Sequence, residues 1–375
     1  MSICVAGSGS GRLWVEMMMA GGSESTGSGG PQMGLFGQGV TASGTSIDPA
    51  PTDDDVRTLG ERLPAGLRLG TSSWSFPGWA GLVYASEASE AKLAQGGLPA
   101  YSAHPLHGTV GLDRSFYRVP TIEQYRGLAG QVPVGFRFLV KAWRAVTDPA
   151  EAEGGATVHR SWSQPAVETF LDARFAEDRV VAPAVLGLGD RLGPIVFQFP
   201  PLGLARGDVG GFLRKLDGFL GGLPRRDLGP LYAAEFRDSA VFENRWAGEL
   251  AASLRAHNVA LGFAHHPRLP KIDEQRSAMD AGEWPVEAQP ACVCRWLLRH
   301  GLGYVEAKER FAPFQELREP DGVTRRQVAD LARAALGAGR ETWVIANNKA
   351  EGSAPLTVRE LAREVASRSA GGEPG

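Results

Sequence analysis

Glu235 and Arg237 stand one residue apart at the end of an apolar run, LYAAEFRD, at residues 231–238. In a β-strand, residues i and i+2 lie on the same face, so the carboxylate and the guanidinium should point the same way. A carboxylate on a buried face is costly unless it is paired or hydrogen-bonded. Two interpretations follow: an ion pair that only closes the structure, or Glu235 as a general acid/base or metal ligand with Arg237 as an anion clamp.

Asp113, Lys141 and Arg295 stand near the ends of three other apolar runs. Asp113 is either a second carboxylate of the site or a residue that caps a turn. Lys141 suits a point charge that binds phosphate better than a Schiff-base nucleophile, since no aldolase-like sequence surrounds it. With Glu235 and Arg237, these residues carry more positive than negative charge. That excess favours an anionic ligand such as a phosphate or a carboxylate.

The adjacent histidines His265 and His266 suggest a metal site, because many enzyme folds gather histidine and carboxylate ligands from separate strand ends. Asp113, Glu235 and His265 form the candidate ligand set for a divalent metal. Adjacent strand residues face opposite ways, so at most one of the two histidines can point inward. The competing interpretation is one hydrogen-bonded interior histidine and one surface histidine. The sequence requires no cofactor, and the divalent metal is kept as an alternative.

Amide and aromatic side chains complete the candidate site. Gln198, Asn347 and Asn348 lie near the ends of two further runs, where they could orient a ligand. Trp74 and Tyr117 belong to aromatic-rich segments that follow two other runs. These aromatic residues are either loop packing or a stacking platform for a sugar or a base.

Eight short apolar runs with strand-like composition must position these side chains. They are LRLGTSS (67–73), TVGLDRSF (109–116), GFRFLVKAW (135–143), GPIVFQFPP (193–201), LYAAEFRD (231–238), NVALGFAHH (258–266), ACVCRWLL (291–298) and ETWVIANNK (341–349). Apolar residues at three-to-four spacing predict helices over 165–181, 245–258, 323–339 and 357–369.

Strands that alternate with helices indicate a parallel sheet, and eight repeats within one domain match a closed barrel. We therefore predict an α/β fold, a single TIM-like (β/α)8 barrel. An open doubly wound sheet would carry a nucleotide-binding glycine fingerprint after its first strand, and the sequence has none there. Reacting groups of such barrels project from the C-terminal ends of the strands, where the candidate residues stand.

Residues 1–60 are rich in glycine, serine and proline and show little hydrophobic periodicity. Such a segment buries too little apolar area to offset its ordering entropy, so the sequence predicts a disordered tail. The barrel domain is expected to span residues 61–369, and residues 370–375 are expected to form a second disordered end.

Composition disfavours several functional classes. The net charge is −3 and no run of Lys or Arg is longer than two, which argues against a nucleic-acid partner. No apolar stretch reaches the roughly 18 residues that span a bilayer, so no membrane role is expected. Cys4, Cys292 and Cys294 form no disulfide or zinc pattern and indicate a reducing compartment, the cytoplasm. The expected partner is therefore a small molecule.

Six segments in a fixed order carry a family resemblance: GTSSWSFPGWAGLVY (70–84), HGTVGLDRSFYRVP (107–120), FRFLVKAW (136–143), LGPIVFQFPP (192–201), YAAEFRD (232–238) and VIANNKAEGSAP (344–355). Together they resemble the domain of unknown function 72 family, the YecE-like proteins, over roughly residues 67–365. The resemblance implies a TIM-like barrel, in agreement with the strand pattern.

Most candidate residues fall on positions that match this family. They are Lys141, Gln198, Glu235, Arg237, Arg295, Asn347 and Asn348. Gly111-Leu112-Asp113 departs from the Glu-Ile-Asn that many members carry. The glutamate of that motif is absent here, so any role that needs its carboxylate does not transfer to this chain.

Three functions stay open at this point. The first, and the one we favour, is an enzyme that performs acid/base chemistry, a hydrolysis or isomerisation of an anionic or sugar-like compound. Glu235 would move the proton with the assistance of Asp113. The second is a divalent-metal enzyme similar to phosphoesterases. The third is a non-catalytic module that binds a metabolite at the polar mouth of the barrel.

Overall fold

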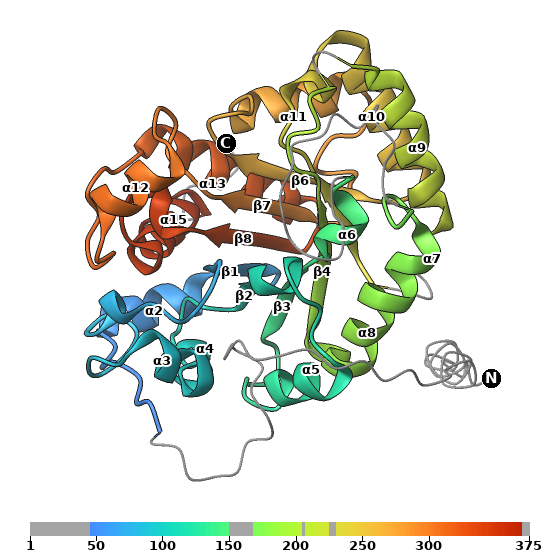
Figure 1. Cartoon of the computed structure of the whole chain (residues 1–375). Coiled ribbons are helices and arrows are strands. Elements are labelled where there is room, and N and C mark those ends of the chain that lie inside the picture. The colour runs from blue at the N-terminus through green and yellow to red at the C-terminus, as the bar shows by residue number, and fades with distance from the viewer. Residues whose placement is uncertain (1–45, 150–167, 205–206, 225–229, 370–375) are drawn as a thin grey trace, which may run out of the picture.

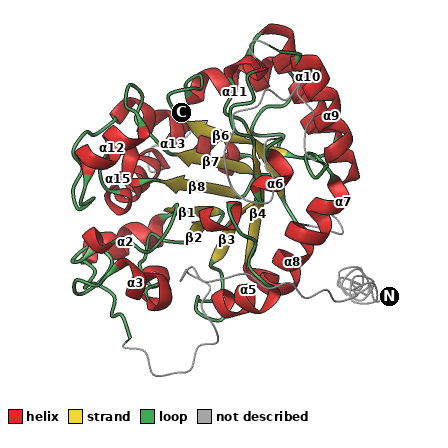
Figure 2. Cartoon of the chain, viewed as in Figure 1, coloured by secondary structure: helices red, strands yellow, loops and turns green. Residues whose placement is uncertain are grey.

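The computed structural model describes residues 46–149, 168–204, 207–224 and 230–369. Eight parallel strands close into a barrel in the order β1 to β8, with helices around it (Figures 1 and 2). The strands are β1 (Leu67–Thr71), β2 (Thr109–Leu112), β3 (Arg137–Lys141), β4 (Leu192–Gln198), β5 (Tyr232–Glu235), β6 (Ala260–His265), β7 (Cys292–Trp296) and β8 (Thr342–Ala346). The predicted fold class is confirmed. Seven predicted runs each contain one strand, and the run 193–201 contains all of β4 except its first residue, Leu192.

Apolar side chains fill the interior of the barrel. Three small residues, Ala233 of β5, Ala260 of β6 and Ala291 just before β7, share this interior cluster with larger ones, which are Leu139, Val196, Val293, Trp343 and Ile345. Side chains of the opposite parity, such as Tyr232 and Ala234, belong to the larger cluster between the strands and the helices. Because both faces of each strand are buried, the strands read as nearly continuous apolar runs. Strand parity therefore decides which polar residues reach the interior.

The first strand is held mainly by the last. β1 pairs with β8 over five residues, beginning with Leu67 opposite Thr342, and with β2 over two. Trp79 Nε1 donates to Asn348 Oδ1 at 3.2 Å, so the loop after β1 is also tied to the segment after β8. Closure of the barrel thus joins residues from opposite ends of the domain.

Helices cover the outside of the barrel. They are α2 (Asp54–Arg62), α3 (Glu90–Gly96), α4 (Leu98–Ser102), α5 (Ile122–Ala129), α6 (Arg144–Thr147), α7 (Ala173–Ala176), α8 (Ala182–Leu188), α9 (Val209–Gly222), α10 (Asn244–Ala256), α11 (Ile272–Ala281), α12 (Tyr304–Phe311), α13 (Gly322–Gly337), α14 (Asn348–Glu351) and α15 (Ala354–Ser369). None of the helices described is long and apolar enough to cross a membrane.

The predicted helices over 245–258, 323–339 and 357–369 are present as α10, α13 and α15. Each has an apolar stripe that packs inward, and Asp321 caps α13 by accepting from the backbone N–H of Thr324 at 3.0 Å. The prediction over 165–181 is met in part. Its first residues lie outside the described ones, and the remainder holds α7 followed by a π-helical turn at Glu177–Val181.

The described fold begins earlier than the predicted tail allows. α2 begins at Asp54, within residues 1–60, and buries Val56 and Leu59, while Arg363 of α15 pairs with Asp55 at 3.1 Å. Two buried apolar residues are too few to stand out in a composition dominated by glycine and serine. The rest of that segment, residues 1–45, and the predicted C-terminal end, residues 370–375, lie outside the described residues.

Gly70 lies where β1 passes close to β2. A Cβ at this position would lie 1.9 Å from the carbonyl oxygen of Thr109. We expect Gly70→Ala to lower the free energy of unfolding by about 1–3 kcal/mol, because the two strands must move apart. Urea denaturation measures this loss. In the control Gly248→Ala, the new Cβ meets no heavy atom of the described chain within 4 Å. It should stabilise α10 by up to about 1 kcal/mol, and equal stability of the two variants would contradict the close approach.

Candidate functional site

The inner faces of several strands end in polar residues. On β5, Glu235 stands two residues after the interior residue Ala233. The equivalent positions of β3, β4 and β7 carry Lys141, Gln198 and Arg295. Because the C-terminal ends of parallel strands meet at one rim of a barrel, these side chains gather there. The register supports this, since Gln198 of β4 lies opposite Glu235 of β5.

Glu235 is completely buried between two guanidinium groups. Arg295 Nη1 lies 3.1 Å from Oε1 and 3.2 Å from Oε2 of the carboxylate, and Arg237 Nη2 forms an ion pair with Oε1. Arg237 also donates to Gln198 Oε1 at 3.3 Å, and Arg295 Nη2 lies 2.6 Å from Asp113 Oδ1. The structure therefore joins five of the predicted site residues in one network, which we call the rim cluster.

The surroundings of Glu235 determine its charge. Burial raises the pKa of this carboxyl, but the charges of Arg237, Arg295 and Lys141 outweigh it, and the pKa is lowered. Glu235 is therefore ionised at neutral pH and has no proton to donate. A lowered pKa also makes this carboxylate a weak proton acceptor, and the arrangement suits a fixed counter-ion that orients the two guanidiniums.

Lys141 has a different environment. Its side chain is buried, and its Nζ lies 3.6 Å from the centre of the Phe116 ring. Burial lowers the pKa of Lys141 to about 7; the carboxylates of Asp113 and Glu235 oppose this shift, and the two guanidiniums of the rim cluster reinforce it. Because the charged neighbours are two acids and two bases, burial decides the sign. The amine and ammonium forms of Lys141 are both populated at pH 7.

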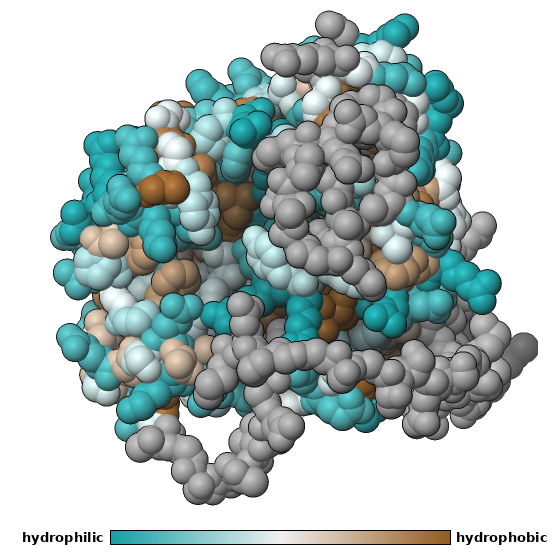
Figure 3. Space-filling view, in the orientation of Figure 1, coloured by the Kyte–Doolittle hydropathy of each residue, from teal (hydrophilic) through white to brown (hydrophobic). Residues whose placement is uncertain are grey.

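A cleft of about 290 Å³ opens beside the rim cluster and shares Gln198 and Arg237 with it. The other lining residues are Phe116, Tyr117, Arg144, Asp148, Pro200, Pro201, His266 and Arg268. The lining thus combines three guanidiniums with aromatic and proline faces. Such a lining suits an anion that carries a ring or another apolar part. On the face drawn in Figure 3, hydrophilic residues cover much of the described surface.

Tyr117 lines the cleft and Asn347 lies at the rim, whereas Asn348 and Trp74 are buried in packing contacts. Tyr117 is 67% exposed in the cleft wall, and Asn347 Nδ2 donates to Ser72 Oγ at 2.7 Å across the rim. Asn348 is buried, and its Oδ1 accepts from the loop after β1 and from the start of α15. Trp74 is also buried and donates through Nε1 to a carbonyl of α3 at 3.0 Å. The predicted ligand contacts of Asn348 and Trp74 are therefore corrected to packing.

The alternative metal site is contradicted by the position of His265. Ala260 points into the barrel, and every second residue after it shares that face. His266, just after β6, therefore lies on the inner face and His265 on the outer face. The ring of His265 packs against Trp296, with 6.3 Å between ring centres. In the described part of the chain, no three His, Cys, Asp or Glu side chains are grouped so that they could hold a metal ion. The set that joined His265 to Asp113 and Glu235 is therefore wrong.

Four residues near the rim were not selected from the sequence: Arg144, His266, Arg268 and Lys349. His266 Nδ1 accepts from the backbone N–H of Arg268 at 3.2 Å, which leaves the ring proton on Nε2. Burial, reinforced by the charge of Arg237, lowers the pKa of His266 to about 4, so its imidazole is a neutral N–H donor. In the sequence, His266 and Lys349 are the last residues of two predicted runs, and Arg144 and Arg268 follow two runs within two residues.

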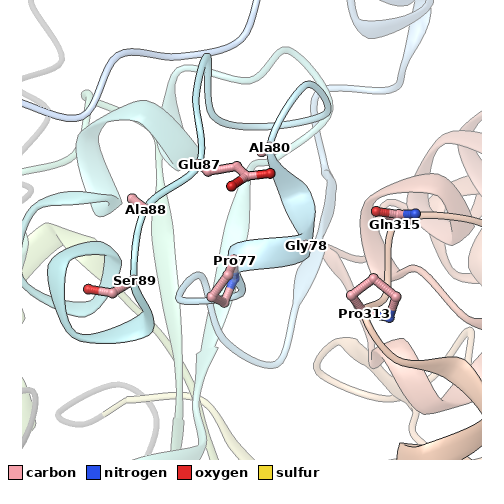
Figure 4. A pocket seen from close by; sticks show the side chains of 8 residues that line it. All are labelled: Pro77, Gly78, Ala80, Glu87, Ala88, Ser89, Pro313 and Gln315. Atoms are coloured by element: carbon pink, nitrogen blue, oxygen red, sulfur yellow. The ribbon is translucent and has the colours of Figure 1, made fainter.

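A larger hollow of about 580 Å³ lies between the loop after β1 and the segment around Pro313 (Figure 4). Its lining consists of Pro77, Gly78, Ala80, Glu87, Ala88, Ser89, Pro313 and Gln315. Glu87 is the charged side chain of this lining, and none of the rim residues belongs to it. Convergent charge therefore favours the smaller cleft as the candidate site.

The comparisons with known proteins agree with the barrel. The family model described as "Protein of unknown function DUF72" matches residues 68–374. A DUF72 family protein of Thermotoga maritima is 17% identical, with 79% of this chain and 98% of that chain covered at a TM-score of 0.55. A DUF72 family protein of Enterococcus faecalis is also 17% identical, with 80% and 95% covered at a TM-score of 0.52. Identities this low show a shared fold alone. None of the curated proteins matches the chain. Since the family model covers most of the sequence, this chain belongs to the DUF72 family.

Proposed function

We propose that this chain is a cytoplasmic enzyme that binds an anionic small molecule in the cleft beside the rim cluster. It transfers a proton to or from that molecule, in a hydrolysis or isomerisation. The observation that carries the proposal is the buried amine of Lys141 beside two guanidiniums that Glu235 holds in place. The buried free thiols of Cys292 and Cys294 support a reducing location.

The charges of the cleft support an anionic ligand. Its lining carries three guanidiniums against one carboxylate, that of Asp148. Guanidiniums bind phosphate and carboxylate groups through paired, charge-assisted hydrogen bonds. Arg237 is already oriented by Glu235 and Gln198, so little side-chain freedom is lost when a ligand binds. The neutral N–H of His266 adds a further donor.

Lys141 supports the acid/base part of the proposal. Proton transfer is most efficient when the pKa of the catalytic group lies near the working pH, and burial gives Lys141 such a value. Asp113 is the charged neighbour that acts most strongly on this amine. Its carboxylate is one-third exposed, so it could pass a proton between Lys141 and solvent. Asp113 thus keeps its predicted assisting role, and Glu235 becomes the counter-ion.

Arg268 offers a test of the anion site, because it lines the cleft but lies outside the rim cluster. We expect inorganic phosphate and small phosphate esters to raise the melting temperature of the protein. In Arg268→Gln their Kd should rise about fivefold to tenfold, since a solvent-exposed charge-assisted hydrogen bond contributes about 1 kcal/mol. Calorimetric titration measures this change. The control Arg62→Gln, at the end of α2, should bind as the unmodified chain does; an equal loss in both variants would contradict a specific site.

The same ligand panel tests the chemistry. Sugar phosphates and hydroxy acids that bind are incubated with the protein, and products are followed by NMR spectroscopy. Lys141→Met should abolish product formation while phosphate binding is retained through the cleft guanidiniums. Full turnover by this variant would overturn the proposed role of Lys141. Binding of panel members without any product would instead favour the non-catalytic module.

A further inference from the structure

The position of Lys141 differs from that of a lysine that only supplies positive charge. The Nζ of Lys141 stacks on the ring of Phe116, which lines the cleft, and Lys141 is 8% exposed. Three guanidiniums already surround the cleft, so a further charge adds little to anion binding. An ammonium that binds phosphate works as a hydrated point charge. The burial of Lys141 instead favours the neutral amine, which has a lone pair available.

We propose that Lys141 Nζ is a nucleophile that forms an imine with the aldehyde or ketone group of an anionic small molecule held in the cleft. This inference rests on the anion site of the proposed function and adds the reactive group of its substrate. The sequence alone favoured the point charge because no aldolase-like motif surrounds Lys141. The reassignment depends on the Phe116 contact, the burial and the adjacent guanidiniums, which only the fold brings together.

The covalent step balances with the groups present. The nitrogen lone pair of Lys141 forms a bond to the carbonyl carbon, and the carbonyl π electrons move to oxygen. The two amine protons pass to that oxygen, the C–O bond breaks with its electrons on oxygen, and one water leaves as the C=N bond forms. Asp113 is suited to carry these protons, because it is the carboxylate that acts most strongly on the amine and is partly exposed.

Desolvation gives the amine its reactivity. Burial lowers the pKa of Lys141 to about 7, so about half of the side chains are neutral at pH 7. A solvated lysine has a neutral fraction of only about 10⁻³ at that pH. Lysines activated by desolvation beside other cations are the ones that form Schiff bases. The contact with the Phe116 ring favours the ammonium. Phe116 lines the cleft, and Lys141, which contacts it, is not itself one of the lining residues.

The aromatic wall of the cleft indicates which carbonyl compounds fit. Phe116 and Tyr117 meet edge to face with 5.3 Å between ring centres, and Tyr117 is exposed to an incoming ligand. Arg237 and Arg268 line the same cleft. A ring-bearing aldehyde with a phosphate group would place its ring against the aromatic wall and its phosphate near the guanidiniums. Pyridoxal 5′-phosphate has this chemistry and serves here as a probe.

The experiment traps the imine. The full chain is incubated at pH 7 with an equimolar amount of pyridoxal 5′-phosphate, and borohydride then reduces the C=N bond to a stable secondary amine. Peptide mass spectrometry compares the label on the six lysines, which are Lys92, Lys141, Lys215, Lys271, Lys308 and Lys349. We expect Lys141 to carry about fivefold more label than Lys349, whose pKa is about 8, and a much larger excess over the four exposed lysines, because its neutral fraction is larger.

Lys349 is the internal control, because it is as buried as Lys141 but stacks on Tyr304, which does not line the cleft. Label concentrated on Lys349, or spread evenly over all lysines, would overturn the inference. Lys141→Arg should lose the adduct, while the positive charge is kept. Mapping on the unmodified chain decides the question even if this variant folds poorly.

A matched ligand separates this inference from the proposed function. Pyridoxine 5′-phosphate carries an alcohol in place of the aldehyde and cannot form an imine. If it binds in the cleft but pyridoxal 5′-phosphate leaves no label on Lys141, the anion site stands and the inference fails. If the alcohol does not bind, and inorganic phosphate and the small phosphate esters do not bind either, the anion site itself fails. In that case label confined to Lys141 would still support a carbonyl-reactive amine.

Discussion

Glu235→Ala is expected to lower the free energy of unfolding by about 3–5 kcal/mol, because it leaves two buried guanidiniums without their common counter-ion. The side chain of Arg295 is 2% exposed and that of Arg237 is 8% exposed, so both guanidiniums are poorly solvated once the carboxylate is removed. Arg295 would keep Asp113, whereas Arg237 would keep only neutral acceptors, Gln198 and the carbonyl of Phe236. Chemical denaturation followed by near-ultraviolet circular dichroism measures the loss.

Glu341→Ala is the matched control for this prediction. Glu341 also pairs with an arginine, Arg68, at 3.3 Å, but its carboxylate is 56% exposed. Removal of an exposed partner should cost at most about 1 kcal/mol. A loss of that small size in Glu235→Ala would contradict the role of Glu235 as the buried counter-ion of the rim. The loss in the free energy of unfolding of Glu235→Gln should lie between those of the two alanine variants, because glutamine keeps a hydrogen-bond acceptor but not the charge.

The stability of the protein should rise between pH 7 and pH 9, and Lys141→Met should remove about 2 kcal/mol of this rise. Folding lowers the pKa of Lys141 from its ordinary value of 10.5 to about 7. Between these values the unfolded chain binds the proton and the folded chain releases it, so the free energy of unfolding increases with pH. Over two pH units this linkage amounts to about 2 kcal/mol. Methionine does not titrate, so the free energy of unfolding of Lys141→Met should rise less steeply with pH.

The difference between the two curves isolates Lys141 from other groups that titrate in this range. Burial also lowers the pKa of Lys349, to about 8, and the buried thiol of Cys292 has its pKa raised to about 12. These groups are unchanged by Lys141→Met, so their contributions cancel in the difference. Lys92→Met, on the exposed face of α3, should leave the curve unaltered. Parallel curves for the unmodified chain and Lys141→Met would show that the amine is not desolvated in solution.

Strand composition predicts the barrel well, because every strand is buried on both faces and its sequence is therefore a mostly apolar run. For the same reason, the sequence of a strand does not show which of its two faces turns into the barrel. In LYAAEFRD the charged residues Glu235 and Arg237 reveal which face turns inward, and the structure agrees. In NVALGFAHH both faces are apolar and both final residues are histidines, so the run does not indicate that His266 rather than His265 lies on the inner face.

The residues contributed by loops could not be placed from the sequence. Arg144 and Arg268 lie beyond the ends of β3 and β6, and their positions in the cleft depend on how those loops turn. Trp74 shows the opposite case: an aromatic residue after β1 looks available for stacking, but the loop carries it into the core. The charge state of Lys141 was also out of reach, because it depends on burial by residues distant in the sequence.

The unequal pairing of β1 has a consequence for how the protein is made. Because β1 shares five paired residues with β8 and only two with β2, its principal partner is synthesised last. At ordinary rates of translation, roughly 15–55 s separate Leu67 from Thr342 as they leave the ribosome. During this interval one edge of the nascent sheet is open, and such an edge can pair with other chains. Emergence of β8 therefore supplies the partner that closes this open edge.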